Sequence, residues 1–269
     1  MEVGGNLEMV YVITHKIFQD EIINNQGYRV LHVGQNGNCK TYYLRDDTGD
    51  NISEKNPHYC ELTGLYWMWK NVQEATSDII GLVHYRRFFT YRVDDIMYTY
   101  FGKKPRILTL EEVYKQLDAY DIILPIPEKI FRTVSRFYRD HHNPDVLVIV
   151  RRIIEKRYPE YIESFDNVMA EHYFYYGNMF ITRKKVLDHY CSWLFSIMEE
   201  VEESMIGEEI TDSYQARVYG FVAERLLQVW VEHNRLKIKT FPVFNTEIKR
   251  MTFVTKNMNR IKHFLSRRK

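Results

Sequence analysis

The sequence contains few cysteines. Cys39, Cys60 and Cys191 lie far apart and form neither a Cys-x-x-Cys pair nor a metal-ligand spacing. Neither a disulfide framework nor a structural zinc site is predicted, so a reducing compartment is favoured. No apolar run approaches the ~20 residues that a membrane-spanning helix needs, and the first nine residues lack the apolar stretch of a secretory signal peptide. These absences predict a cytoplasmic protein that at most lies on the inner face of the cell membrane.

The sequence also lacks an excess of basic residues. It contains 37 Lys and Arg and 36 Asp and Glu, which gives a net charge of +1. Domains that bind nucleic acid usually carry a strongly basic balance, so nucleic acid is not an expected partner. The pattern G-x-x-x-x-G-K-[S/T] does not occur, which excludes a P-loop kinase. We find neither an internal repeat nor a low-complexity linker, and the hydrophobic fraction of 45% suffices for a sizeable core.

Tyrosine is abundant, with 21 copies in an aromatic fraction of 15%. Its side chain has an apolar face and a polar tip, which suits flat hydrophilic ligands such as bases and sugars. Tyrosine-rich cores also occur in proteins that bind no such ligand. The composition alone leaves both interpretations open.

Short β-branched and aromatic runs alternate with longer apolar or amphipathic stretches. The runs predict strands at residues 9–14, 28–33, 78–84, 121–125, 179–181 and 238–243. The stretches predict helices at residues 57–71, 110–119, 144–157, 184–201 and 211–233. The alternation predicts a single α/β domain over residues 1–250, with a mainly parallel central sheet flanked by helices and a helical C-terminal section.

The helix expected at residues 57–71 has apolar residues on almost every face, which predicts that it is buried all round. Asn56 and Pro57 form a good helix start. The pattern makes Glu61 and Lys70 conspicuous, because a buried charge needs a partner or a ligand. Neighbouring backbone groups or an arginine would satisfy the same need without any ligand.

The strand expected at residues 78–84 is apolar on both faces, as in the interior of a parallel sheet. Ligands collect beyond the carboxyl ends of strands in open α/β sheets. The polar cluster His84-Tyr85-Arg86-Arg87 falls at such an end, and its adjacent guanidinium groups predict an anion site. If the chain stays extended, Arg86 and Arg87 point to opposite sides, so that only one faces the site.

Three acidic segments are further candidates for a metal site. Asp94 and Asp95 form an acidic turn, and residues 46–51 form an Asp/Gly-rich turn that is more typical of a solvated loop. Residues 140–145 (DHHNPD) include potential metal ligands. Adjacent histidines on irregular chain seldom converge on one ion, so this part is better interpreted as a mobile segment that covers a substrate.

The C-terminal tail, residues 251–269, is basic and amphipathic. Six Lys and Arg and no acid lie between residues 255 and 269, interleaved with Met, Ile, Phe and Leu. The pattern is typical of a segment that lies on an anionic membrane surface. A solvated basic terminus, or contact with RNA, would have the same composition.

Several segments together resemble a known family. NISEKNPHYCELTGLYWMWKN and IGLVHYRRFF, with the later GNMFI and YGFVAERLLQVW, resemble bacterial capsular polysaccharide and exopolysaccharide biosynthesis glycosyltransferases, a family long described only as a domain of unknown function. The resemblance extends from Val10 to about Phe244. It implies a GT-A-like (Rossmann-like) fold and a hexosyltransferase acting on a growing, lipid-linked capsule, exopolysaccharide or O-antigen glycan. A UDP-linked donor of galactose or galactofuranose is implied by the resemblance only.

Transfer from such a donor develops negative charge on the departing diphosphate, which needs positioned cations. Many GT-A enzymes hold a divalent cation there with an Asp-x-Asp motif, which this sequence lacks. We expect Arg86, Arg87 and His84 to replace the metal; a mechanism with Mn²⁺ or Mg²⁺ bound by Asp94 and Asp95 stays open. The residues expected to bind the nucleotide and its diphosphate are Thr14, His15, Lys16, Lys70, His84, Tyr85, Arg86 and Arg87.

An inverting transfer also needs a general base for the acceptor hydroxyl. Glu224, in the GFVAE segment, resembles the acid that inverting GT-A enzymes often carry near a helix start. Asp212 and Glu171 are the other carboxylates considered, and an ion pair with Arg225 or Arg217 is the alternative role of Glu224. The residues expected to contact the acceptor are Asn178, Glu61 and Glu171.

Two other functions stay open from the sequence. The first is a non-catalytic module that keeps the fold and binds a carbohydrate or a nucleotide. The second is a phosphotransferase acting on polysaccharides, since an arginine-histidine cluster also suits phosphoryl transfer. Turnover of a nucleotide sugar separates the first from an enzyme, and an essential metal or a phosphohistidine would indicate the second.

Overall fold

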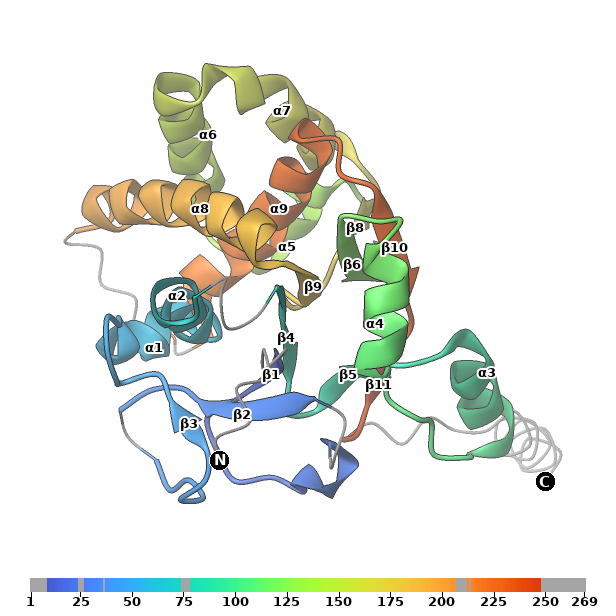
Figure 1. Cartoon of the computed structure of the whole chain (residues 1–269). Helices are drawn as coiled ribbons and strands as arrows, with labels where there is room; N and C mark the ends of the chain where they lie inside the picture. Colours follow the sequence, from blue (N-terminus) through green and yellow to red (C-terminus); the bar gives the residue numbers. More distant parts are fainter. Residues whose placement is uncertain are drawn as a thin grey trace, which may run out of the picture.

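The computed structural model describes residues 9–23, 27–35, 37–73, 78–206, 212 and 214–247. Its largest sheet has the order β10-β6-β9-β4-β1-β2-β3, and β5 and β11 extend it beside β4 (Figure 1). A small second sheet pairs β7 with β8. The strands are β1 (Met9–Thr14), β2 (Tyr28–His32), β3 (Leu44–Arg45), β4 (Ile79–His84), β5 (Arg87–Phe89), β6 (Ile122–Pro125), β7 (Glu128–Lys129), β8 (Tyr173–Phe174), β9 (Phe180–Arg183), β10 (Ile238–Phe241) and β11 (Val243–Asn245).

The sheet is mainly parallel. β1 pairs in parallel with both β2 and β4, β2 with β3, and β6 with β10. The exception on the main path is β9, which runs antiparallel between β4 and β6. Its close approach to β4 depends on Gly81, since a Cβ there would lie 2.6 Å from the carbonyl oxygen of Phe180. The expected fold class, a mainly parallel sheet flanked by helices, is confirmed.

Helices cover both faces of the sheet (Figure 1). Because side chains alternate along a strand, Tyr11 and Ile13 of β1 join the core under α1, α2 and α5–α9, whereas Val10 and Val12 join the core under α4. The α-helices are α1 (Asn56–Tyr59), α2 (Leu62–Asn71), α3 (Arg92–Phe101), α4 (Leu110–Leu117), α5 (Val134–His141), α6 (Asp145–Arg157), α7 (Ile162–Ala170), α8 (Lys184–Ser204) and α9 (Val218–His233). The 3-10 segments are η1 (Asp20–Ile23), η2 (Ser53–Lys55), η3 (Pro159–Tyr161) and η4 (Gln215–Arg217).

The single buried helix expected at residues 57–71 is wrong. The chain forms α1 and α2 with a break at Cys60, whose φ is +52°. Glu61 follows the break directly and lines a cavity at the sheet edge. α2 is also not buried all round, because Lys70 is exposed and its ammonium lies 3.7 Å from the centre of the Trp69 ring. A cation–π contact on the surface therefore satisfies Lys70.

Three other helices correct the expectations. Asp94 and Asp95 lie in the first turn of α3 and do not form a loop turn. Residues 134–141, expected as irregular chain, form α5, which Thr133 caps by accepting a hydrogen bond from the Arg136 amide. α7 was not expected at all. α3, α5 and α7 span only ten, eight and nine residues, so each shows fewer than about three turns of the helical pattern, which is too short a stretch for the sequence to reveal it clearly.

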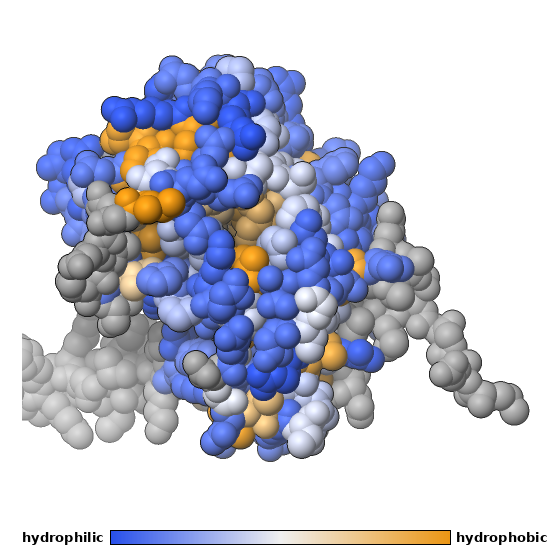
Figure 2. Space-filling view, turned by 90° about the vertical axis from the view of Figure 1, so that its left-hand side faces the viewer, coloured by the Kyte–Doolittle hydropathy of each residue, from blue (hydrophilic) through white to orange (hydrophobic). Residues whose placement is uncertain are grey.

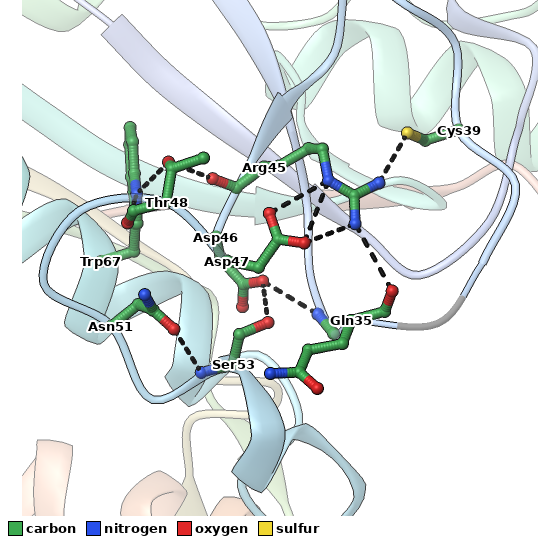
Figure 3. Close-up of polar contacts among 10 residues, drawn as sticks. Gln35, Cys39, Arg45, Asp46, Asp47, Thr48, Asn51, Ser53 and Trp67 are labelled. Carbon is green, nitrogen blue, oxygen red and sulfur yellow. Dashed lines mark hydrogen bonds and ion pairs between the residues drawn. The ribbon is translucent and has the colours of Figure 1, made fainter.

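The turn at residues 46–51 is a structural connection. The buried Asp46 carboxylate accepts hydrogen bonds from the Gly34 amide at 2.9 Å and the Ser53 hydroxyl at 2.6 Å (Figure 3). Arg45 binds Asp47 and contacts Cys39, which fixes the loop after β2. These contacts hold that loop and the start of α1 against the end of β2.

The carboxyl ends of β1 and β4 meet at one edge of the sheet. Ile13 is in register with His84, and the Tyr85 amide donates to the Ile13 carbonyl at 3.0 Å. From β1 the chain crosses to β2 on one side, while β4 lies on the other. Ligands of open α/β sheets bind at such a switch point.

Much of the surface is polar on the face shown in Figure 2, with a hydrophobic area in its upper part, at the height of α6 and α8 in Figure 1. Over the described ranges, no helix combines the length and the apolarity that a membrane span requires. The tail, residues 251–269, lies outside the described residues.

Candidate functional site

A cavity of about 480 Å³ opens at the carboxyl ends of β1 and β4. The sheet edge, the α1–α2 break, the loop before β9 and the start of α9 form its walls. The lining residues are Ile13, Thr14, His15, Val33, Asn56, Pro57, Cys60, Glu61, His84, Tyr85, Arg86, Arg87, Gly177, Arg217 and Glu224.

Three guanidinium groups line this cavity, those of Arg86, Arg87 and Arg217. The chain turns sharply after β4, so that His84 pairs with Arg87 at the start of β5. The chain is therefore not extended here, so the condition under which only one of Arg86 and Arg87 would face the site is not met, and both line the cavity. Arg86 also pairs with Glu247 at 3.0 Å. Clustered planar cations of this kind suit a diphosphate, whose oxygens they bind in pairs.

Glu224 brings a carboxylate into the same cavity from α9. Its side chain is 12% exposed. One oxygen, Oε1, accepts a hydrogen bond from the Gly177 amide at 2.8 Å, and the other, Oε2, accepts from Nη1 of Arg225 at 2.7 Å. Burial raises the pKa of Glu224 to about 7, although the Arg225 charge opposes the rise. A carboxylate with this pKa is suited to take up a proton near neutral pH.

Arg225 is itself buried and was expected only as an ion-pair partner of Glu224. Its guanidinium lies between two aromatic rings, with its central carbon 5.2 Å from the centre of Tyr138 and 4.8 Å from that of Phe174. It also donates to the Phe221 carbonyl at 2.9 Å. Because the rings and the carbonyl fix the guanidinium, the guanidinium in turn fixes Oε2 of Glu224.

His84 lies against the loop that precedes β9. Its Nε2 contacts the carbonyl oxygen of Gly177, which requires a proton on that nitrogen. Burial lowers the pKa of His84, so the ring is neutral at pH 7. In the neutral form, His84 is a hydrogen-bond donor to the Gly177 carbonyl.

The backbone conformation of Gly177 favours glycine, because its φ is +85°. A Cβ there would also lie 3.1 Å from Nη1 of Arg87, so the Arg87 side chain would have to shift slightly. The next residue, Asn178, is 2% exposed and donates to Oε1 of Glu61 at 2.7 Å. Asn178 thus ties this loop to the α1–α2 break, and Glu61, not Asn178, reaches the cavity wall.

Comparison with known proteins identifies the family of this chain. A sequence model of the family described as "Domain of unknown function (DUF4422)" matches residues 9–235. The chain belongs to the DUF4422 family. The resemblance noted from the sequence is thereby confirmed in part, for membership of a family described as a domain of unknown function, and its link to capsule and exopolysaccharide biosynthesis stays a prediction.

The DUF4422 chain is also similar to a solved structure, titled as the apo form of the bifunctional glycosyltransferase WbbM. The TM-score is 0.74 and the sequence identity is 28%, over 91% of this chain and 46% of that one. The chain therefore spans about half the length of WbbM. No curated protein matches.

Other residues predicted for the site lie at its margin or outside it. Thr14 is buried at the end of β1, where its hydroxyl donates to the Lys16 carbonyl, and it lines the cavity together with His15 and Tyr85. The Lys16 side chain faces a neighbouring cavity, with Nζ 4.8 Å from the centre of the Tyr85 ring and 3.5 Å from Glu247. Lys70 does not line the cavity.

Two predicted carboxylates lie away from the cavity. Asp212 is exposed, and its Oδ1 accepts from the amides of Tyr214 and Gln215 just before α9. Glu171 is exposed at the end of α7, where its carbonyl accepts from the Val134 amide. The Asp212 carboxylate thus serves a local turn, and neither Asp212 nor Glu171 lies at the cavity wall.

The alternative metal residues also lie elsewhere. Asp94 binds Arg106 through both of its oxygens. Asp95 lines a second cavity on the other side of Arg87. Within the described ranges, no three His, Cys, Asp or Glu residues are grouped as metal ligands.

Sequence reasoning missed some residues that line the cavity. Arg217, whose Nε lies 3.2 Å from the Cys60 sulfur, was considered only as an ion-pair partner of Glu224. Cys60 and Asn56 were treated as parts of a helix. Arg217 comes from η4 and Asn56 and Cys60 from the two ends of α1, and a local sequence pattern gives no signal that these distant segments meet at one cavity.

Proposed function

We propose that this chain is a glycosyltransferase that uses a nucleotide-diphospho-sugar donor. One observation carries the proposal: a cavity at the switch point of the sheet combines the cations of Arg86, Arg87 and Arg217 with the carboxylate of Glu224. The cations suit a leaving diphosphate, and the carboxylate suits an acceptor proton. The likeness to part of a bifunctional glycosyltransferase supports the same reaction class.

In the proposed step, the acceptor oxygen forms a bond to the anomeric carbon of the donor sugar. The bond from that carbon to the diphosphate oxygen breaks, and its electron pair leaves with the diphosphate. The acceptor proton passes to the Glu224 carboxylate. A single displacement of this kind inverts the anomeric centre.

The arginines stabilise the charge of the leaving group in this proposal. Arg86 and Arg87 follow β4 directly, and Arg217 faces them from the segment before α9. His84 holds the Gly177 carbonyl and shapes the floor. We expect full transfer activity in excess EDTA; activity that EDTA abolishes and Mn²⁺ restores would instead establish the metal-dependent alternative.

The finer identity of the substrates comes from the sequence resemblance. The donor is proposed to be UDP-linked, with galactose or galactofuranose as its sugar. The acceptor is proposed to be a lipid-linked capsule, exopolysaccharide or O-antigen glycan. The basic tail, residues 251–269, would bring the enzyme to the inner face of the membrane.

A thermal-shift screen of UDP, GDP, CMP, UDP-galactose and UDP-galactofuranose tests the donor class. Binding to the folded state raises the melting temperature, so UDP and a UDP-sugar should stabilise the protein while GDP and CMP should not. Transfer to a glycan acceptor is then followed by UDP release. Binding of the donor without turnover would favour the non-catalytic module, and a phosphorylated histidine would favour the phosphotransferase.

A further inference from the structure

A second cavity of about 450 Å³ lies at the same edge of the sheet. It opens beyond the ends of β6 and beside β11. Its walls include Arg87, Asp95, Glu128, Tyr176, Met179 and Asn245. Its volume is within the usual range for a small-molecule site.

The two cavities share a wall. Arg87 lines both of them, Gly177 lines the first and Tyr176 lines the second. Two consecutive residues of the loop before β9 therefore face different cavities. The Gly177 amide also binds Glu224, so the carboxylate lies at this boundary.

Electrostatic interactions of Tyr176 also indicate that the two cavities lie close together. Burial raises the pKa of the Tyr176 phenol, and the carboxylates of Glu128 and Glu224 raise it further. Glu128 lines the second cavity and Glu224 the first. The Tyr176 side chain thus lies within electrostatic reach of carboxylates from both cavities.

The linings differ in charge. Three guanidinium groups and two carboxylates, those of Glu61 and Glu224, line the first cavity. One guanidinium group, that of Arg87, and two carboxylates, those of Asp95 and Glu128, line the second. Two carboxylates beside one cation disfavour an anion such as a second phosphate. A neutral polyhydroxyl ligand fits better, because carboxylate and amide groups bind hydroxyls and an aromatic face packs on the apolar face of a sugar ring.

We propose that the second cavity binds the terminal sugar of the acceptor and presents its hydroxyl to Glu224 across Gly177. This inference rests on the proposed function, and it adds where the acceptor binds and that the bound group is a neutral sugar. Tyr176 supplies the aromatic face. Asp95, Glu128 and Asn245 supply polar groups for the remaining hydroxyls.

Saturation-transfer NMR on the full chain tests this site without requiring turnover. The probes are the methyl glycosides of galactose, glucose, mannose, rhamnose and N-acetylglucosamine, each measured with saturating UDP. At least one should give a signal with the wild type. That signal should fall at least about fivefold in Tyr176→Ala and in Asn245→Ala, while UDP affinity stays within about twofold of the wild type.

Tyr173→Ala is the matched control, because Tyr173 is an exposed tyrosine of the same segment that lines neither cavity. Its glycoside signal should equal that of the wild type. Equal signals in all three variants, or no glycoside signal with the wild type, would overturn the acceptor site. A wild type that fails to bind any nucleotide would instead overturn the proposed function, so the two failures are distinguishable. Asn245→Ala keeps the test decisive if Tyr176→Ala does not fold.

Discussion

Glu224 is the residue whose surroundings most constrain the reaction. A base with a pKa of about 7 is mostly protonated below pH 7 and mostly ionised above it. The groups that face it are Arg225, Glu61, Arg87 and the Gly177 amide. Since only the ionised form accepts the proton, kcat/KM should fall about tenfold per pH unit below pH 7 and reach a plateau above it.

Replacing the carboxylate tests this assignment. Glu224→Gln keeps the shape of the side chain and removes the base, so kcat should fall by about 10²–10⁴-fold. Glu232→Gln, an exposed position on the same helix, should leave the rate near that of the wild type. Near-normal turnover of Glu224→Gln, with circular dichroism unchanged, would reject Glu224 as the base.

Arg225 is expected to act through Glu224 and not on the substrate. Its charge lowers the pKa of that carboxyl, so Arg225→Met should move the acidic limb of the pH profile to higher pH. Arg225→Lys keeps the charge and should leave the limb near pH 7, with a lower kcat because a lysine lacks the planar fork. Identical pH profiles in the wild type and in a folded Arg225→Met variant would show that the arginine is only structural.

The loop before β9 is the element that lies between the two cavities, which are the proposed donor and acceptor sites. Gly177→Ala places a Cβ 3.1 Å from Nη1 of Arg87 at a φ of +85°. We expect a loss of about 1–2 kcal/mol of unfolding free energy together with a marked loss of activity, as measured by denaturant titration and by UDP release.

Gly102→Ala provides the control for backbone strain. Gly102 also has a positive φ, +71°, but it ends α3, and it lines neither of the two cavities at the sheet edge. The same substitution there should cost a similar stability and leave kcat unchanged. Equal activity losses in both variants would mean that strain alone, and not the crowding of Arg87 and His84, explains the effect.

Elements also differ in how well the sequence revealed them. β1 was predicted to the residue, and β2, β4 and β6 within one residue, because compact β-branched runs are buried on both faces of a parallel sheet. The polar cluster His84-Tyr85-Arg86-Arg87 was expected directly after β4, where it lines the cavity, and its binding of an anion stays a prediction. The α1–α2 break and the Gly177–Glu224 bond could not be predicted, because each depends on contacts between segments far apart in the chain.

At the scale of the whole molecule, β11 is the last described strand, and Glu247 beyond it binds Arg86 and Lys16. A chain shortened to residues 1–250 lacks only the tail and keeps these contacts, so we expect it to keep its melting temperature and its UDP affinity. It should lose binding to vesicles that contain anionic lipid, which the full chain should bind with an affinity that falls as salt rises. Co-sedimentation with anionic and with neutral vesicles, at several salt concentrations, measures this binding. Equal binding of the full and the shortened chain would show that the tail does not contact the membrane.

The reversed direction of β9 has a consequence for how substrate range can change. Its amino end, and not its carboxyl end, meets the edge where β1, β4 and β6 finish. Under the proposed function, consecutive residues of one short connection thus have three roles: Tyr176 would contact the acceptor, Gly177 aligns Glu224, and Asn178 attaches the loop to the α1–α2 break. Replacing Tyr176 alone would then be enough to change the acceptor preference. An insertion that shifts Gly177 would instead break the hydrogen bond by which the Gly177 amide aligns Glu224.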